Sequence, residues 1–340
     1  MSTSSPDIQL LGGVSTTDGL EVVSHLRARC IIGAHPATVE ALSGGVSNDV
    51  LAVESGGVSV VVKRALEQLR VAEEWHADPT RVLTEAAALQ AASRIQPDVV
   101  PPVLDIDEAA RIIVIGRAPA PCHEWRSDLM DGHVDIAVAQ RLGTILATWQ
   151  RETARIPEIA QQFNSTEAFR QLRIDPFFSW VAGQHPDLAP TIDQVVHQMV
   201  ETRTCFVHGD FSPKNVLLGP DLTWVIDWEV AHFGDPSFDV AFLVTHLLCK
   251  ALHRPELTAD YRDAAAAFMA SHERGLATTD LLPDPDHLAR QTACLLLARI
   301  DGKSPAPYLN DAARVRGREI ARSSIADGDP NIDHIWRRLA

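Results

Sequence analysis

Three oxygen-bearing side chains carry the clearest chemical signal in this chain. Asp210 lies in the segment 207–217, Asn215 follows it by five residues, and Asp227 follows Asn215 by twelve. A phosphoryl-transfer centre needs one carboxylate that takes the proton of the attacking hydroxyl. It also needs an amide oxygen and a second carboxylate that hold magnesium on the nucleotide phosphates. The spacing therefore predicts an enzyme in which Asp210 is the base and Asn215 and Asp227 bind Mg²⁺.

The local sequence indicates how these residues are held. Asp210 follows an apolar pair and lies in a loop that ends at Pro213, so its carboxylate is free to meet a substrate hydroxyl. By itself it would be a turn residue that bonds its own backbone, and only the partners at 215 and 227 favour the catalytic role. Asp227 follows the short apolar strand 225–226. Magnesium prefers few hard oxygen donors from protein, which one amide and one carboxylate supply.

Three neighbouring polar residues have two readings each. His208 precedes the base by two residues and is predicted to hold the loop rather than to react. Lys214 either neutralises the transferring phosphoryl group or is a solvated lysine. Glu229 either approaches a metal or a cationic substrate, or is a surface or supporting glutamate. Residue types and spacing leave the roles of Lys214 and Glu229 open.

The segment after Asp227 predicts a helix that supports this loop. Pro236 can begin a helix with Asp235 as its cap. Asp239 falls early in that helix and is predicted to support the backbone of the loop around Asp210 rather than to react. The apolar stripe of the predicted helix consists of Val240, Leu243, Val244 and Leu247.

The first third of the chain contains a second set of residues that suit a nucleotide. Lys63 ends the β-branched strand 58–63, and Glu85 lies on the following helix. A strand lysine can contact the α- and β-phosphates while a helix glutamate orients it. The turn 42–48 precedes both, and its small residues allow backbone N–H groups to fold over phosphates. The turn residues expected at the nucleotide are Gly44, Gly45 and Ser47.

The elements that must position these residues fall into two groups. Up to about residue 20 the chain is predicted to be loose, and residues 20–30 to form a short helix. A β-rich small lobe is then expected, followed by a larger helical lobe. The small lobe contains strands around the turn 42–48, a helix over 78–95, and strands at 99–106 and 111–115. Further helices are predicted at 135–155, 166–172, 188–201, 236–250, 259–272, 285–300 and 311–325, with short strands at 216–217 and 224–226.

Composition narrows the class of protein. The 340 residues are 46% hydrophobic, enough for two lobes with a buried core, and the net charge of −15 argues against a nucleic-acid-binding surface. The five cysteines are scattered and form no CxxC pair, so a reducing compartment is expected. No apolar signal core or membrane-length apolar run is present. A soluble cytoplasmic protein without a nucleic-acid or membrane partner is expected.

Together these motifs resemble the aminoglycoside phosphotransferase and choline-kinase-like family, which has a protein-kinase-like fold. The resemblance rests on the segments 208–215, 226–229 and 234–236 with Asp239, and on the turn 42–48 with Lys63 and Glu85. It implies an α+β, two-lobed fold with a hinge near 113–117. The implied domains are an N-terminal extension with a short helix over 1–36, a nucleotide-binding lobe over 37–116, and a catalytic and substrate-binding lobe over 117–340. One departure is Gln150, where many relatives have a histidine.

The resemblance implies a kinase that transfers the γ-phosphoryl group of ATP or GTP, with Mg²⁺, to a small-molecule alcohol. The acceptor would be a sugar, an aminoglycoside or an amino alcohol. Substrate contacts vary within the family, so Arg126, Arg299 and Lys303 are candidates without an assigned role. Two alternatives stay open: a metal-dependent phosphohydrolase built on His208, Asp210 and Asp227, and a nucleotide-binding pseudokinase.

Overall fold

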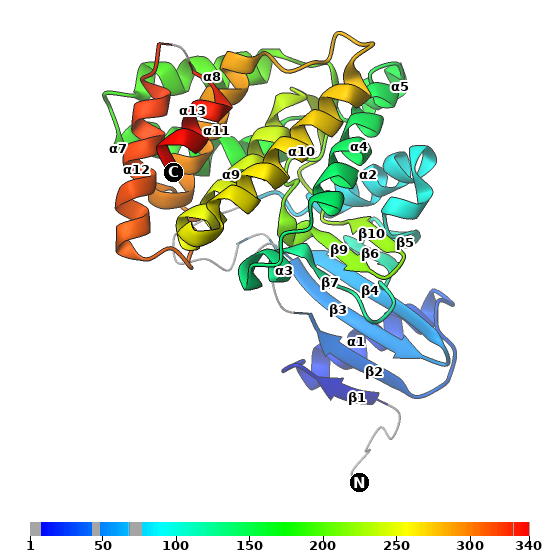
Figure 1. Cartoon of the computed structure of the whole chain (residues 1–340). Helices are drawn as coiled ribbons and strands as arrows, with labels where there is room; N and C mark the ends of the chain where they lie inside the picture. The colour runs from blue at the N-terminus through cyan, green and yellow to red at the C-terminus, as the bar shows by residue number, and fades with distance from the viewer. Residues whose placement is uncertain (1–7, 43–47, 67, 69–76, 329, 340) are drawn as a thin grey trace.

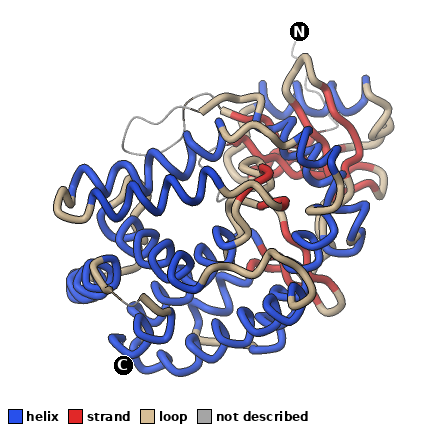
Figure 2. The backbone as a smooth tube through the Cα atoms, turned by 90° about the horizontal axis from the view of Figure 1, so that it is seen from above, coloured by secondary structure: helices blue, strands red, loops and turns tan. Residues whose placement is uncertain are grey.

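The chain forms two lobes, one built on a β-sheet and one mainly helical (Figure 1). The computed structural model describes residues 8–42, 48–66, 68, 77–328 and 330–339. Figure 2 shows the strands gathered toward one side of the molecule and the helices packed together over the rest. This arrangement confirms the predicted α+β, two-lobed fold.

The smaller lobe is built on a six-stranded sheet with the strand order β1-β2-β3-β4-β6-β5. β1 runs parallel to β2, and the other neighbours are antiparallel. The strands are β1 (Ile8–Leu11), β2 (Ala37–Ala41), β3 (Asn48–Ser55), β4 (Val58–Ala65), β5 (Val103–Asp107) and β6 (Ile112–Gly116).

Both faces of this sheet are buried, which explains the uninterrupted β-branched run in β4. Val60 and Val62 pack in the core cluster of helix α1 (Thr16–Ala28), whereas Val61 packs in the cluster of helix α2 (Arg81–Ile95). Because side chains alternate along a strand, Lys63 shares the face of Val61. The pleat of β4 therefore aims the lysine toward α2.

The amino-terminal segment differs from its prediction. It was expected to be loose up to about residue 20, but β1 adds a parallel strand to the sheet and α1 begins at Thr16. The hydroxyl of Ser15 accepts the N–H of Asp18 at 3.1 Å and so caps the helix. A four-residue strand has too short a pattern to recognise in the sequence. Its partner β2 lies far along the chain, so only the tertiary structure reveals the pairing.

The larger lobe contains most of the predicted helices within a few residues of their expected ends. The segment predicted as a helix at 166–172 is instead a short α-helix followed by a π-helix (Arg170–Ser179). The helices are α3 (Trp125–Asp131), α4 (Ile136–Thr153), α5 (Pro157–Gln162), α6 (Glu167–Phe169), α7 (Trp180–Gln184), α8 (Ala189–Glu201), α9 (Ser237–His253), α10 (Thr258–Leu276), α11 (Pro285–Asp301), α12 (Asp311–Ile325) and α13 (Ile332–Leu339). The short strands are β7 (His123–Glu124), β8 (Cys205–Val207), β9 (Val216–Gly219), β10 (Leu222–Val225) and β11 (His232–Gly234).

The connection between the lobes follows β6. The hinge was expected near 113–117, but Ile113 to Gly116 pair with β4, so the connection starts at Arg117. Arg117 forms ion pairs of 2.8 Å with Glu40 and with Glu54 on the sheet. Among the helices of the described residues, none has the length and apolar character needed to cross a bilayer.

Candidate active site

The loop that carries Asp210 requires a glycine before it. Gly209 has a φ of +77°, and a Cβ atom there would lie 2.7 Å from the carbonyl oxygen of Val230. Both the backbone conformation and the lack of space therefore exclude a side chain. The loop leaves β8, which pairs with β11, so its starting point is anchored in a small sheet.

Asp239 on α9 holds the backbone of this loop. Its two carboxylate oxygens accept the N–H groups of His208 at 2.7 Å and Gly209 at 2.9 Å. The side chain is fully buried, and burial raises its pKa to about 7 against the opposing effect of the two donors. At the start of α9, the carboxylate of Asp235 accepts the N–H of Ser237 at 2.9 Å. These bonds confirm the predicted support of the loop.

His208 is a neutral, structural histidine. Its Nδ1 accepts the N–H of Asp210 at 3.1 Å, so the ring proton lies on Nε2, which donates to the carbonyl oxygen of Ile226 at 3.1 Å. Burial lowers the pKa of His208 to about 4, so the ring stays uncharged at neutral pH. The imidazole thus ties the loop of Asp210 to the segment before Asp227, as predicted.

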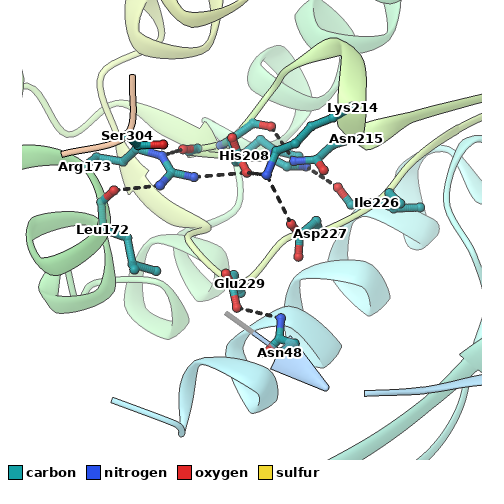
Figure 3. Close-up of polar contacts among 12 residues, drawn as sticks. Asn48, Leu172, Arg173, His208, Lys214, Asn215, Ile226, Asp227, Glu229 and Ser304 are labelled. Atoms are coloured by element: carbon teal, nitrogen blue, oxygen red, sulfur yellow. Dashed lines mark hydrogen bonds and ion pairs between the residues drawn. The ribbon is translucent and has the colours of Figure 1, made fainter. Parts of the chain in front are cut away.

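Two cations meet the carboxylate of Asp210. Arg173 Nη2 lies 3.1 Å and Lys214 Nζ 3.0 Å from Oδ2, and the two side chains point toward one another across the site (Figure 3). Burial opposes ionisation, but Arg173 and then Lys214 outweigh it, so the pKa of Asp210 lies below its ordinary value. The carboxylate is therefore ionised at neutral pH. Because both cations contact Oδ2, Oδ1 can face an acceptor hydroxyl.

The sequence did not mark Arg173 as a functional residue. It lies on the π-helix, where its Nε donates to the carbonyl oxygen of Gly209 at 2.6 Å and its guanidinium stands 5.4 Å from the ring centre of Phe242. An arginine between Leu172 and Ile174 looks like any solvent-facing helix residue in sequence. Only its burial and its partner reveal it.

Asn215 and Asp227 present oxygen atoms in the same region. The amide nitrogen of Asn215 donates to the carbonyl oxygen of Asp210 at 2.9 Å, so the amide oxygen is the end that can bind a cation. The backbone of Asn215 also accepts the N–H of Ile226 at 2.9 Å, which fixes the spacing to Asp227. Asp227 has a φ of +69°. One amide oxygen and one carboxylate are hard donors that fit magnesium.

Lys63 joins the two lobes at this site. Its Nζ lies 2.5 Å from Oε1 of Glu85 and 3.1 Å from Oδ1 of Asp227. Burial disfavours the ammonium, but Asp227 and Glu85 outweigh it, so the pKa of Lys63 is raised and the side chain stays charged. Burial raises the pKa of Asp227, but Lys63 and then Lys214 outweigh it, so this pKa lies below its ordinary value. The structure brings together the lysine and glutamate that the sequence singled out.

Glu229 forms a second link between the lobes. Its Oε2 accepts from Asn48 Nδ2 at 2.9 Å and from Arg81 Nε at 3.0 Å, and its side chain is buried (Figure 3). Glu229 was predicted either to approach a metal or a cationic substrate, or to be a surface or supporting glutamate. Its contacts with Asn48 and Arg81 show that it supports the structure. Neither Asn48 nor Arg81 had an assigned role. For Arg81 the reason is that nothing in the sequence distinguishes a buried helix arginine from an exposed one.

The remaining predicted residues are placed as follows. Gly44, Gly45 and Ser47 lie outside the described residues. Arg126 and Arg299 line a cavity beside Asp210, whereas the ammonium of Lys303 lies 4.9 Å from the ring centre of Trp180.

That cavity has a volume of about 480 Å³ and is continuous with the carboxylate of Asp210. It is bounded by Arg173 and Lys214 on the side of the loop, and by α9 and the end of α11. Its size suits a small organic molecule. The described part of the chain contains no group of three His, Cys, Asp or Glu side chains arranged to hold a metal ion.

Comparison with known proteins agrees with this geometry. The model of the phosphotransferase enzyme family (APH) matches residues 38–282. Methylthioribose kinases of Bacillus cereus strains AH820 and B4264 are 27% and 28% identical over 243 residues, which cover 63% of this chain and 61% of those proteins. The chain therefore spans less than two thirds of the length of these relatives.

A solved structure gives the same fold. The amicoumacin kinase hAmiN in complex with AMP-PNP, Ca²⁺ and Ami has a TM-score of 0.55 and 16% sequence identity, covering 89% of this chain and 92% of that chain. The family match extends over more than half of the sequence and includes both lobes with Lys63, Asp210 and Asp227. The chain belongs to the phosphotransferase enzyme family.

Proposed function

We propose that this protein is a kinase that transfers the γ-phosphoryl group of Mg-ATP to the hydroxyl of a small molecule. One observation carries the proposal. Lys214 Nζ lies 3.0 Å from the Asp210 carboxylate and 4.0 Å from the Asp227 carboxylate, so one ammonium group bridges the two acids. This arrangement places a base and a metal ligand on the two sides of one mobile cation. It suits the transfer of a phosphoryl group from a nucleotide on the side of Asp227 to a hydroxyl on the side of Asp210.

The nucleotide side of the site is assigned to Lys63, Asn215 and Asp227. Lys63, oriented by Glu85, would contact the nucleotide phosphates, and Asn215 and Asp227 would hold Mg²⁺ through oxygen atoms. Mg-ATP, when bound, supplies an electrophilic phosphoryl group whose charge the metal partly neutralises. Kinases named among the relatives, and AMP-PNP with Ca²⁺ in the complex of hAmiN, support this assignment. Backbone around Gly44, Gly45 and Ser47 is proposed to cover the phosphates.

The acceptor side is assigned to Asp210. Its Oδ1 orients the acceptor hydroxyl and takes the proton as the new oxygen–phosphorus bond forms. Because Arg173 and Lys214 keep the pKa of Asp210 low, the carboxylate is a weak base and receives the proton late in the reaction. The ammonium of Lys214 is free to follow charge from Asp210 toward the transferring group.

The five cysteines form no disulfide, which supports a cytoplasmic site of action.

Substitution of Asp210 tests the proposal. The variant Asp210→Asn keeps the volume but cannot accept the proton, so kcat should fall by roughly a thousandfold while the Kd for Mg-ATP changes less than about threefold. Asp221→Asn, in an exposed turn between β9 and β10, is the matched control and should retain wild-type turnover. Acceptor-dependent ADP release and nucleotide titration provide the two readouts. Undiminished turnover in Asp210→Asn would refute the assignment.

A further inference from the structure

The cavity beside Asp210 contains a second set of charged residues that the proposed chemistry does not use. Lys250 lies on α9, Arg299 on the last turn of α11, and Tyr308 in the segment after α11. These three residues line one cavity with Asp210, although they come from separate parts of the chain. Lys250 is only 1% exposed.

Lys250 is a buried cation without a matching anion. Its Nζ has one long contact of 3.5 Å to the carbonyl oxygen of His246 and stands 5.7 Å from the ring centre of Tyr308. Among the described residues, no carboxylate lies within ion-pair distance of it. Burial of an unpaired ammonium is costly, and burial lowers the pKa of Lys250 to about 8.

Arg299 and Tyr308 also have polar atoms without partners. The guanidinium of Arg299 donates to the carbonyl oxygen and, at 3.1 Å, to the hydroxyl of Ser304, but its Nε is buried without a partner in the described structure. The hydroxyl of Tyr308 is likewise buried without a hydrogen bond there. Such groups are rare in folded proteins, and each one calls for an acceptor that the described residues do not provide.

The side chains that line the cavity carry an excess of positive charge. Five basic residues line it, and the two carboxylates, Asp210 and Glu229, are each already bonded to cations. The chain as a whole carries a net charge of −15, so this local excess of positive charge runs against the overall composition. The basic residues are Arg126, Arg173, Lys214, Lys250 and Arg299. Arg126 is paired with Glu124 at 2.8 Å, which leaves Lys250 and Arg299 as the cations without a carboxylate.

α9 sets the distance between the reacting end and this cation pair. Phe242, His246 and Lys250 are four residues apart and share one face of the helix. The guanidinium of Arg173, which contacts Asp210, lies over Phe242, and the ring of His246 is 5.1 Å from that of Phe242. Phe242 and Lys250 are therefore separated by about 12 Å along the helix axis. One small molecule can reach from Asp210 to Lys250.

Resting on the proposed kinase function, we propose that the acceptor is an alcohol that carries a carboxylate or phosphate group. Lys250, Arg299 and Tyr308 bind that anion while the hydroxyl of the same molecule faces Asp210. The anion would accept hydrogen bonds from the three groups that otherwise lack an acceptor. An acceptor with a positively charged nitrogen at this end would meet two cations and no carboxylate. The inference thus favours hydroxy acids and sugar acids or phosphates over amino alcohols.

Acceptors that share a carbon skeleton and differ in charge test the proposal. ADP release with gluconate, sorbitol and glucosamine should show that the acid has the highest kcat/KM of the three. Glycerate and glycerophosphate compared with glycerol and serinol repeat the test at shorter length and separate carboxylate from phosphate. Hydrogen bonds to a charged group make the expected preference about tenfold or more. A preference for the neutral or cationic member of each set would overturn the proposal.

Variants show whether the cation pair causes the preference. In Lys250→Met and Arg299→Met, the ratio of kcat/KM for the acid to that for the neutral alcohol should fall at least fivefold. Lys303→Met is the matched control, since this nearby ammonium lies over Trp180, and its ratio should equal that of the wild type. A ratio that is the same in all four proteins would overturn the proposal that Lys250 and Arg299 bind the anion.

A binding measurement separates failure of this inference from failure of the kinase assignment. With saturating Mg-ADP present, inorganic phosphate and acetate are titrated and the Tm is followed. Wild type and Lys303→Met should show a saturable rise that Lys250→Met and Arg299→Met lack. An equal response in all four would indicate an adventitious ion only and would contradict the proposal. If no acceptor of any charge is phosphorylated, the kinase assignment fails, and this titration still decides whether the pair binds an anion.

Discussion

At the scale of single residues, the cations around Asp210 determine how its carboxylate behaves. Arg173 and Lys214 contact the same oxygen and favour the ionised form against burial. They therefore extend the pH range in which the residue can accept a proton, but they make it a weaker base. A low-pKa carboxylate suits a reaction in which the hydroxyl must be oriented first and deprotonated late.

Loss of Arg173 should move the acid limb of the pH–rate profile. Asp210 must be ionised to act, so activity falls as the pH drops through its pKa. Arg173→Met removes a cation that lowers this pKa, so the limb should shift to higher pH and kcat at neutral pH should fall roughly tenfold or more. Arg170→Met, three residues earlier and largely exposed, serves as control. An unshifted acid limb in Arg173→Met would contradict the role of Arg173.

Lys250 lowers the stability of the folded protein, because burial of its charged side chain is unfavourable. Its pKa falls from 10.5 to about 8, which at about 1.4 kcal/mol per pKa unit corresponds to about 3 kcal/mol. Lys250→Met should therefore increase the free energy of unfolding at pH 7 by an amount of this order. Between pH 8 and 10.5 the unfolded chain binds this proton and the folded chain does not, so wild-type stability rises and the gain shrinks. Urea unfolding at pH 7 and pH 10 gives the comparison; a destabilised variant at pH 7 would contradict it.

At the scale of elements, α9 organises the site with its two ends. Its first turn places Asp239 on the loop of Asp210, and its far end places Lys250 in the cavity beside Asp210. Gln150 on α4 helps to fix the start of α9, since its amide nitrogen donates to the carbonyl oxygen of Pro236 at 3.0 Å and its amide oxygen accepts from His272 at 2.7 Å. The glutamine that departs from the common family pattern is thus a buried bridge between α4, α9 and α10.

Removal of Asp239 tests the link between α9 and the loop. Asp239→Ala leaves the N–H groups of His208 and Gly209 buried without an acceptor, so the free energy of unfolding should fall by about 2–4 kcal/mol. kcat should fall as well, because the loop is no longer held. The control Asp260→Ala removes an exposed acid from the first turn of α10 and should change stability by less than about 0.5 kcal/mol. Equal effects of the two substitutions would show that the loop does not depend on Asp239.

At the scale of the whole molecule, two ion pairs join the lobes, one buried and one half-buried. Lys63 contacts Asp227, and Arg81 contacts Glu229, so the segment 227–229 of the larger lobe is bonded to β4 and to α2 of the smaller one. Arg81 also donates to the carbonyl oxygens of Leu66 and Ala77 and so fixes the approach to α2. The position of one lobe relative to the other therefore depends on charged groups that are largely removed from water.

A double-mutant cycle measures the Arg81–Glu229 link. Glu229→Ala alone removes the buried carboxylate that Arg81 Nε contacts and should cost about 3–5 kcal/mol of stability. Arg81→Met combined with Glu229→Ala removes both charges, so the double variant should be more stable than the sum of the two single changes predicts. Urea unfolding of the four proteins gives the coupling energy. Simple additivity would mean that the two side chains do not interact.

Much of the fold was accessible from the sequence because it depends on local patterns. The helices α4, α9, α11 and α12 lie within a few residues of their predicted ranges, and α9 follows from its apolar stripe and begins beside Asp235 and Pro236 as expected. β1 was missed because four residues carry too little pattern and its partner β2 lies almost thirty residues away. The π-helix was missed because a sequence with helical periodicity does not specify the extra residue in each turn.

The sequence by itself indicated the reaction class that we propose, because Asp210, Asn215 and Asp227 lie within eighteen residues of one another and short-range spacing constrains their geometry. It also placed Lys63 and Glu85 on adjacent elements, where strand alternation and helix position bring them together. Only the tertiary structure decided which cations surround Asp210 and what lines the cavity beside it. Arg173 and Lys250 come from distant helices, and burial alone distinguishes them from the exposed basic residues of the same chain, whereas Arg299 was a candidate whose place in the cavity only the structure gives. Charge in a cavity depends on which side chains lose water together, and that is settled by packing rather than by order along the chain.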